Sequence, residues 1–505
     1  MRVLYVFFCV FVVLSTAANI WPLPKKITEE GDAINLSKLF VIQSESKSDV
    51  VVSAITRYSE FIGIGKEDNG LKYIVIEVEN DDAALGYDTD YSYEIKIDGD
   101  NGKISAKTPY GALYGLETLS EIIEEGKLEH NHISIEDEPT YNHRGIMIDT
   151  GRRFSPLHTI KMVIDSMPYN KLNVLHFHLS DWARVAIESK IYPQLTSLLV
   201  GDHDGFYTQE EIKDIIEYAR LRGVRVIPEI DIPGHSMGFK ALAEVGMQFC
   251  DSSKKQLYGD KEGRSFKVLS TLLEEILSLF PEPFVHLGCD ETETIGVCNV
   301  QTAADFEKQI FDFVYNKLGK RPIAWEESLF IKHSMIKEGV VNGWNNHHNP
   351  EILSLGYDAI ENRNRHFYLN KLNISPKDIW TNLGTITKCY NNKNILFGGE
   401  ISMWTDNYCY AAQCGAYSGG KPVGWQLYYR EHDTQFEESM LSLIYPRAIV
   451  GAGTFWRYNP SLDVTSNTFI SLYTAANNRL NKRGIYTCPM NCTCNEISKC
   501  GKKYL

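Results

Sequence analysis

From about residue 141 onward, short strand-like runs alternate with helical segments, and this alternation constrains the fold more than any other feature of the sequence. Such alternation predicts βα units and a parallel sheet. Eight runs are recognised: Gly145–Ile148, Val174–Phe177, Val224–Ile227, Phe284–Leu287, Pro322–Trp325, Val340–Gly343, Asp358–Ile360 and Ile395–Phe397. Eight units in one continuous stretch predict a (β/α)8 TIM barrel. A doubly wound open sheet is the alternative, but no Gly-x-Gly-x-x-Gly motif follows the first run.

The preceding residues, 19–140, are predicted to form a small α+β domain with an antiparallel sheet. Tyr93–Ile97 and Lys103–Lys107 flank a turn-rich loop, as the strands of a hairpin do. Tyr110–Ile123 carries apolar residues at helical spacing. We find no cluster of chemically active residues here, so this domain is expected to pack against the barrel. Residues 141–487 then form the catalytic barrel, and residues 488–505 a Cys-rich tail.

Residues 1–18 have the pattern of a secretory signal peptide. Arg2 supplies the positive start, and the apolar run Leu4–Leu14 is too short to span a bilayer as a helix. Ser15–Ala18 provides small residues for cleavage after Ala17 or Ala18. We therefore expect a protein of the secretory pathway, lysosomal or secreted, without a membrane span.

Charge and cysteine content narrow the class further. The formal net charge is -14 and there is no long basic run, so nucleic acid is not an expected partner. Cys9 leaves with the signal, and the even number of cysteines that remains predicts disulfides in an oxidising compartment. A stapled tail is favoured over a zinc knuckle for Cys488, Cys492, Cys494 and Cys500. Glycosylation is expected at the sequons of Asn35, Asn373 and Asn491.

Polar and aromatic residues follow the strand-like runs, where barrel enzymes place their active sites. Those after the first four runs are Asp149, Arg152, His178, Asp181, Glu229, Asp231, His235, Asp290 and Glu291. Those after the last four are Trp325, Glu326, Trp344, Tyr368, Trp404 and Asp406. Each residue by itself is explained equally well as a local ion pair or a core aromatic. Their shared position at strand ends predicts a single site.

Three chemistries can be compared at such a site. His176 and His178 share one face of a strand, as metal ligands do, but no further ligands occur at fixed spacing, so structural histidines and no metal or cofactor are expected. A Ser-His-Asp hydrolase is disfavoured because the Gly-x-Ser-x-Gly elbow is missing. Tryptophans among carboxylates favour a sugar. Asp290 and Glu291 are neighbours whose side chains diverge, which suits substrate-assisted glycoside hydrolysis better than an ordinary nucleophile and acid.

Several motifs together resemble family 20 glycoside hydrolases, the β-N-acetylhexosaminidases, and especially the lysosomal hexosaminidase type. The motifs are Trp21–Pro24, Gly111–Glu117, His143–Thr150 with Arg152, Lys171–His178, Glu217–Gly223, Pro228–His235, Phe284–Glu291, Gly398–Trp404 and Arg483–Ile485. They extend over nearly the whole chain after the signal. The resemblance implies an N-terminal α/β domain, a catalytic barrel and exo-acting removal of N-acetylhexosamines from glycans.

The resemblance also implies roles for single residues. The 2-acetamido group of the substrate would attack the anomeric carbon, with Asp290 holding its N–H, Tyr368 its oxygen, and Glu291 as acid and then base. Arg152, Trp325, Trp344, Trp404 and Asp406 would bind the sugar. His235, with Asp181, Glu229, Asp149 and His178 around it, would support the catalytic carboxyls. A homodimer or heterodimer is suggested, and Cys250–Cys298 is the preferred disulfide.

The chain departs from the family pattern at four places. Cys289 replaces the glycine before the carboxyl pair, Trp182-Ala183 replace an Asp and a Gln, and Gly453-Thr454 replace Glu-Arg. The segment Asn407–Glu438 is longer than usual and carries Cys409 and Cys414. Because both catalytic carboxyls persist, we expect activity. A non-catalytic N-acetylhexosamine-binding protein on the same fold and a metal-dependent hydrolase are the alternatives.

Overall fold

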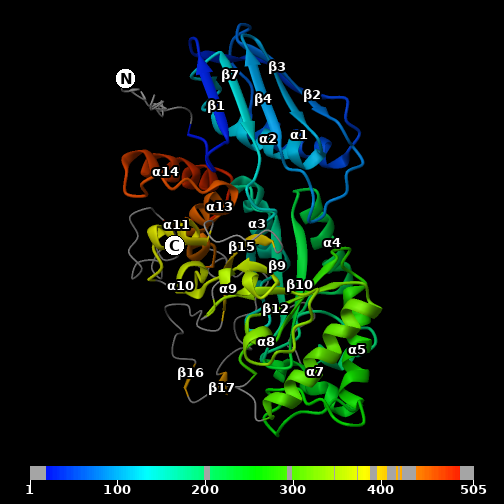
Figure 1. The fold of residues 1–505 in the computed structure, drawn as a ribbon. Coiled ribbons are helices and arrows are strands. Elements are labelled where there is room, and N and C mark those ends of the chain that lie inside the picture. Colours follow the sequence, from blue (N-terminus) through cyan, green and yellow to red (C-terminus); the bar gives the residue numbers. More distant parts are fainter. Residues whose placement is uncertain are drawn as a thin grey trace, which may run out of the picture.

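The computed structural model describes residues 19–197, 205–292, 298–345, 347, 349–371, 373–386, 395–405, 417–418, 421–422 and 440–488. Figure 1 shows a sheet with two helices at the top of the molecule and a barrel below it. Asp406, Cys409, Cys414, Asn491 and the tail beyond Cys488 lie outside the described residues.

The N-terminal sheet has seven strands in the order β1-β7-β4-β5-β3-β2-β6. They are β1 (Lys26–Glu30), β2 (Ile34–Ser44), β3 (Leu71–Val78), β4 (Tyr93–Asp98), β5 (Asn101–Ala106), β6 (Lys127–Leu128) and β7 (His132–Asp137). Most neighbours are antiparallel, as predicted, and the β4–β5 hairpin turns at Gly99 with φ +62°. Two pairs, β2–β3 and β3–β5, are parallel, and α1 (Asp49–Ile62) supplies the crossover from β2 to β3.

Helix α2 (Pro109–Ile122) joins this sheet to the barrel, since nearly all of its residues are buried. On the barrel side, the Tyr114 hydroxyl donates to the Leu172 carbonyl at 3.1 Å. Nearby, the fully buried Lys171 ammonium pairs with the Asp137 carboxylate at 3.0 Å. The N-terminal domain therefore packs against the barrel, as the sequence predicted.

Eight parallel strands close into a barrel, and all eight lie where the sequence predicted them. They are β8 (His143–Asp149), β9 (Val174–Ser180), β10 (Arg225–Ile232), β11 (Phe284–Gly288), β12 (Arg321–Trp325), β13 (Val340–Gly343), β14 (Asp358–Glu361) and β15 (Leu396–Met403). Nearly every residue in these strands is buried, because the helices cover their outer side and side chains fill the interior.

The segments between and after the strands are mostly helical. They are α3 (Leu157–Ser166), η1 (Pro168–Asn170), η2 (Pro193–Leu195), α4 (Gln209–Arg220), η3 (Ser236–Val245), α5 (Arg264–Leu277), α7 (Val300–Asp312), η4 (Phe313–Lys317), α8 (Glu327–Phe330), α9 (Asn349–Ser354), α10 (Asn364–Phe367), α11 (Pro376–Ile386), α13 (Arg447–Arg457) and α14 (Asn467–Lys482), with short strands β16 (Tyr417–Ser418) and β17 (Lys421–Pro422). Helix α4 starts at the expected capping box of Thr208 and Glu211, and Gly223 after it has φ +70°.

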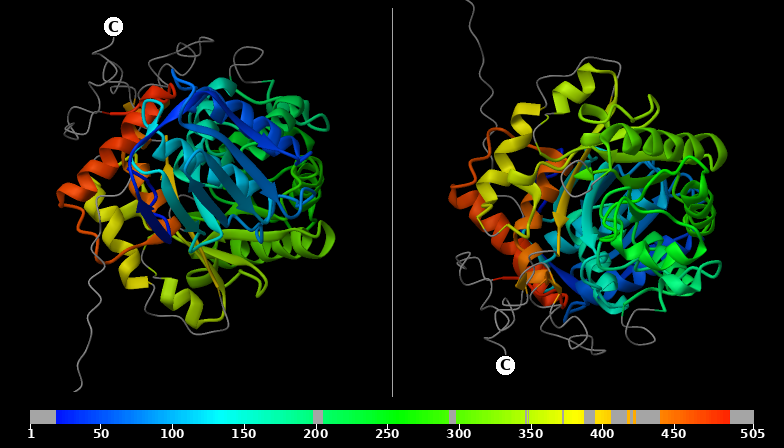
Figure 2. Two further views of the ribbon diagram at one scale, coloured as in Figure 1. Left: turned by 90° about the horizontal axis from the view of Figure 1, so that it is seen from above. Right: turned by 90° about the horizontal axis from the view of Figure 1, so that it is seen from below.

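An apolar layer closes the barrel at the N-terminal ends of its strands. It consists of Val174, Ile227, Phe284, Ile323, Val340, Ile360 and Phe397. Tyr87, from the N-terminal domain, packs on it with its ring centroid 4.3 Å from that of Phe397. The view from above in Figure 2 shows the sheet lying across the barrel. This layer, called the barrel floor below, leaves the opposite end of the barrel for the site.

The first described residues are held against the last helices. Trp21 is fully buried, and its indole N–H donates to the Ile449 carbonyl of α13 at 2.8 Å. A Cβ added at Gly453 would lie 2.2 Å from Trp21 Cζ2, so the glycine at this departure from the family pattern makes room for the indole ring. Elsewhere, Cys250 and Cys298 form a disulfide, which is the preferred pairing. Among the described residues, no helix is long and apolar enough to cross a membrane.

Substituting Gly453→Ala tests the contact with Trp21. Alanine favours a helix by up to about 1 kcal/mol over glycine, but overpacking against a buried ring costs about 1–3 kcal/mol. The free energy of unfolding should therefore fall, as measured by urea titration. Gly86→Ala is the control, since a Cβ there meets nothing within 4 Å. A Gly453→Ala protein that is more stable than the wild type would contradict the packing described.

Candidate active site

The carboxyl pair of Asp290 and Glu291 follows β11 on a backbone with unusual dihedral angles. Cys289 and Glu291 have φ of +70° and +47°, and Gly288 has +67°. The turn sends the two acids apart: the Asp290 side chain is 11% exposed, and that of Glu291 is 43% exposed. Burial would raise the pKa of Asp290, but His235 outweighs it and holds that pKa below its usual value. The pair therefore consists of one buried carboxylate and one accessible carboxyl.

His235 links the two acids. Its Nε2 lies 3.4 Å from Asp290 Oδ2 and 3.5 Å from Glu291 Oε2, and its Nδ1 lies 3.3 Å from Asp181 Oδ1. Burial acts to lower the pKa of His235, but the carboxylates of Asp181 and Asp290 outweigh it and hold the pKa well above its ordinary value. These contacts favour the protonated ring, which lies next to both acids.

Arg152 is fixed by two buried carboxylates beside His235. Its guanidinium lies 3.1 Å from Asp149 Oδ2 and 3.0 Å from Asp181 Oδ2. It also lies over the ring of Trp404, with Cζ 4.9 Å from the centroid. A guanidinium held by two carboxylates in this way has a fixed orientation, and its planar set of donors suits hydroxyl recognition.

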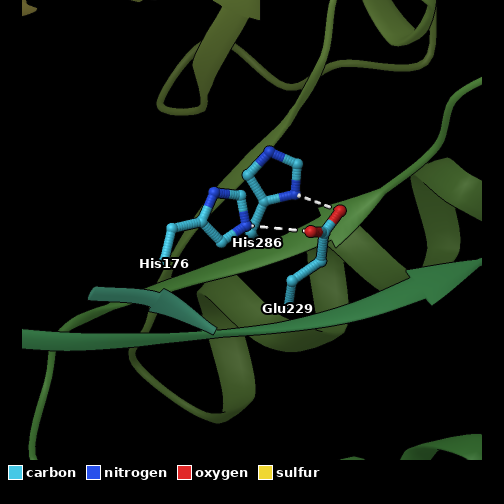
Figure 3. A group of neighbouring side chains, drawn as sticks. All are labelled: His176, Glu229 and His286. Carbon is cyan, nitrogen blue, oxygen red and sulfur yellow. Dashed lines mark ion pairs between the residues drawn. The ribbon is translucent and has the colours of Figure 1, made fainter. Parts of the chain in front are cut away.

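Glu229 is the centre of the barrel interior below these residues. Its carboxylate lies 2.9 Å from His176 Nε2, 2.5 Å from His178 Nδ1, 3.0 Å from His286 Nδ1 and 3.0 Å from Trp325 Nε1. Figure 3 shows His176 and His286 side by side and both directed at this carboxylate. Burial would raise the pKa of Glu229, but His178 and the other imidazoles hold it well below its usual value.

Three clusters in the described residues have the composition of a metal site. They are His176, Glu229 and His286; His178, Asp181 and Asp231; and Asp231, His235 and Asp290. In the first, the two imidazoles lie 2.9 and 3.0 Å from the Glu229 carboxylate, and His286 Nδ1 also accepts the Gly288 backbone N–H at 3.1 Å. These contacts favour the structural role expected for the histidines.

The contacts join into one file of alternating imidazoles and carboxyls along the barrel, called the charge chain below. In order, its members are His143, Glu400, His176, Glu229, His178, Asp181, His235 and the pair Asp290 and Glu291. Glu400 and Glu229 each bridge two or more imidazoles, so the carboxyl pair is connected to His143 at the start of β8 by a series of direct contacts.

Aromatic rings line the other side of the site. Trp344 and Tyr368 lie parallel with centroids 6.0 Å apart, and Tyr368 lies 5.8 Å from Trp404; these three form the aromatic wall. Burial raises the pKa of Tyr368 well above its usual value, so the phenol keeps its donor proton. Trp325, by contrast, has no exposed surface and donates to Glu229. Its contact with a sugar stays a prediction.

Cys289 fits beside the carboxyl pair because its side chain is buried in the core. The Lys332 ammonium donates to its carbonyl at 2.7 Å. Burial raises the pKa of the thiol well above its usual value, so it is a neutral packing group. Gly288 has to be glycine for another reason: a Cβ there would lie 1.8 Å from Asp231 Oδ1.

Sequence reasoning assigned no role to Asp231, Glu327 or Lys332. Burial and the nearby Asp290 carboxylate raise the pKa of Asp231 well above its usual value. Burial and, to a smaller extent, the Asp290 carboxylate also raise the pKa of Glu327 to about 8. Asp231 lies at the C-terminal end of β10 and Glu327 shortly after β12, so position at a strand end was the available signal. Their contacts depend on neighbouring strands and could not be read from spacing.

Comparisons with known proteins agree with this geometry. Residues 141–459 match the family described as "Glycosyl hydrolase family 20, catalytic domain", and residues 64–122 match "beta-acetyl hexosaminidase like". The chain is 30% identical to beta-hexosaminidase subunit B2 of Dictyostelium discoideum, over 78% of each protein. It is 31% identical to beta-hexosaminidase subunit beta of Mus musculus, over 63% of this chain and 64% of that protein.

Solved structures share the fold. The chitobiase of Flavobacterium johnsoniae superposes with a TM-score of 0.74 at 24% identity, covering 93% of this chain and 73% of the other. A mutant beta-hexosaminidase of Streptomyces plicatus, in complex with its product GlcNAc, gives 0.72 at 18% identity, covering 94% and 97%.

The raised pKa of Glu327 predicts how stability depends on pH. Its value in the unfolded chain is 4.5 and in the fold about 8, so the folded state binds the proton more tightly. The free energy of unfolding of the wild type should therefore fall, relative to Glu327→Gln, by up to about 1.4 kcal/mol per pH unit as pH rises between these values. Urea titrations at several pH values measure this difference. Glu60→Gln, at an exposed position of α1, controls for the loss of one charge. Parallel profiles for Glu327→Gln and wild type would contradict the shift.

The positive φ of Cys289 predicts unequal effects of two small substitutions. Cys289→Gly relieves backbone strain of roughly 1–2 kcal/mol but loses the burial of a side chain, which costs about 1 kcal/mol. Because the two effects oppose each other, the free energy of unfolding should change by less than about 1 kcal/mol. Cys289→Val places a β-branched residue at φ +70° and should destabilise by a further 1–3 kcal/mol or so. Equal destabilisation of the two variants in urea titrations would refute this account.

Proposed function

The chain belongs to glycosyl hydrolase family 20, and from this premise we propose that it is an exo-acting β-N-acetylhexosaminidase that removes terminal non-reducing GlcNAc or GalNAc from glycans. The reaction is retaining and substrate-assisted. The carbonyl oxygen of the 2-acetamido group attacks the anomeric carbon as the glycosidic bond breaks, forming an oxazolinium ion. Water then adds to the anomeric carbon and the ring reopens.

Glu291 is the proton carrier in both steps. It gives its proton to the leaving oxygen and then takes one from the attacking water. Its side chain is the accessible member of the carboxyl pair, and His235 Nε2 lies 3.5 Å from it. An imidazolium at that distance would stabilise the carboxylate left after the first step.

Asp290 and Tyr368 hold the acetamido group. The buried Asp290 carboxylate accepts the amide N–H and stabilises the positive charge that develops on the group. Tyr368 donates its phenol proton to the carbonyl oxygen. The observation that carries the proposal is the pairing of one buried and one accessible carboxyl on the shared imidazole of His235, because this divides the roles as the reaction requires.

The remaining pocket residues orient the sugar. Arg152 and Asp406 bind its hydroxyls, and Trp344 and Trp404 pack on its apolar face, with Trp325 below them. The Trp404 ring lies 5.8 Å from that of Tyr368 and 4.9 Å from the Arg152 guanidinium, so the groups assigned to the sugar stand together. Substrates are glycoconjugates or chitooligosaccharides.

The proposal also covers the compartment and the oligomeric state of the protein. The leader-like residues 1–18, the disulfide of Cys250 with Cys298, and the exposed sequons at Asn35 and Asn373 support a glycoprotein of the secretory pathway, lysosomal or secreted. The relatives carry subunit names, which supports a homodimer or heterodimer.

Glu291→Gln should abolish hydrolysis of a chromogenic β-N-acetylglucosaminide, and Asp290→Asn should lower kcat/KM by roughly 10²–10⁴-fold. Steady-state kinetics at the optimum pH measures both. Near-normal turnover by Glu291→Gln would contradict the proposed mechanism. Wild-type protein that binds GlcNAc without turnover would be a sugar-binding protein, and activity lost on chelation would indicate a metal-dependent hydrolase.

A further inference from the structure

Two adjacent carboxyls follow β12, at the turn into α8. Glu326 and Glu327 are buried, with 3% and 4% of their surface exposed. A buried carboxyl is costly unless it makes hydrogen bonds that the fold needs. The hydrogen bonds described below for these two carboxyls are directed at the segment after β13, where Trp344 stands.

Glu326 fixes the backbone of that segment. Its carboxylate accepts the backbone N–H groups of Trp344 at 2.9 Å, Asn345 at 3.0 Å and His347 at 3.1 Å. Three donors on one carboxylate leave the segment little freedom to move.

Glu327 fixes the side chain of the same tryptophan. The indole Nε1 lies 3.1 Å from Oε1 and 3.0 Å from Oε2 of Glu327. The half-buried indole is also parallel to Tyr368, with 5° between the planes. The hydrogen bond therefore sets how the indole ring is turned within the aromatic wall.

Lys332 extends the same segment to the other side of the site. Its ammonium donates to the Cys289 carbonyl at 2.7 Å and lies 3.5 Å from the Glu307 carboxylate of α7. Cys289 directly precedes the catalytic pair. Residues 326–332 thus contact both the loop that carries the acids and the segment that carries Trp344.

We propose that residues 326–332 hold the aromatic wall at a fixed distance from the acids, with Glu327 as the positioning residue that orients Trp344 against the bound sugar. The inference rests on the proposed function, and it adds residues to which that function assigns no role. Glu327 acts through Trp344 and does not touch the reacting atoms.

A double-mutant cycle tests this mechanism. Glu327→Leu removes the acceptor at similar size, Glu327→Gln keeps a carbonyl acceptor, and Trp344→Phe keeps a ring without the N–H. In the wild-type background, Glu327→Leu should raise KM for a chromogenic β-N-acetylglucosaminide up to about tenfold, the worth of one hydrogen bond, with a smaller fall in kcat. Glu327→Gln should restore most of the loss. In the Trp344→Phe background, Glu327→Leu should change KM by less than about twofold.

A control variant separates an effect on the orientation of Trp344 from an effect on the stability of the fold. Glu282 is buried at the opposite end of the barrel, where its carboxylate pairs with Arg225 at 2.6 Å. Glu282→Gln should lower the unfolding temperature without changing KM. An unchanged KM in Glu327→Leu, or an equal rise of KM in both Trp344 backgrounds, overturns the inference. The proposed function is not affected by either result as long as the wild type is active. An inactive wild type overturns the proposed function first.

Discussion

A buried carboxylate surrounded by three imidazoles and an indole N–H is the interaction on which the site depends. Glu229 lies on β10, and these neighbours come from β9, β11 and β12, so one carboxylate joins the side chains of four neighbouring strands. Against the effect of burial, neighbouring carboxylates raise the pKa of His176, His178 and His235, whereas burial lowers that of His143, so opposite charges are favoured next to one another from His176 to the acids. The same pairing holds the pKa of Asp290 below its usual value despite burial.

The sequence was sufficient for the barrel, and it predicted where the candidate site would lie. Each strand is a short apolar run followed by a polar residue at its C-terminal end, so hydrophobic pattern and topology together place residues as distant as Asp149 and Trp404 in one group. The resemblance to the family then gave roles to those residues. Hydrophobic pattern and family resemblance can both be recognised without a structure, because both depend on residues close together in the sequence.

What the sequence could not supply depends on contacts across strands. The parallel pairs of the N-terminal sheet, the full burial of Trp325 and the bonds of Glu327 to Trp344 all join residues with no characteristic spacing. Cys289 is a further example. A thiol beside two acids suggests a reactive group, whereas its contacts make it a packing group, at the cost of a left-handed backbone.

The barrel floor has a consequence for how the two domains fold. Tyr87 belongs to the N-terminal domain, yet its ring packs on Phe284 and Phe397 of the barrel floor. A barrel without that tyrosine would expose part of this apolar layer to water. Docking of the first domain is therefore part of completing the apolar core of the second.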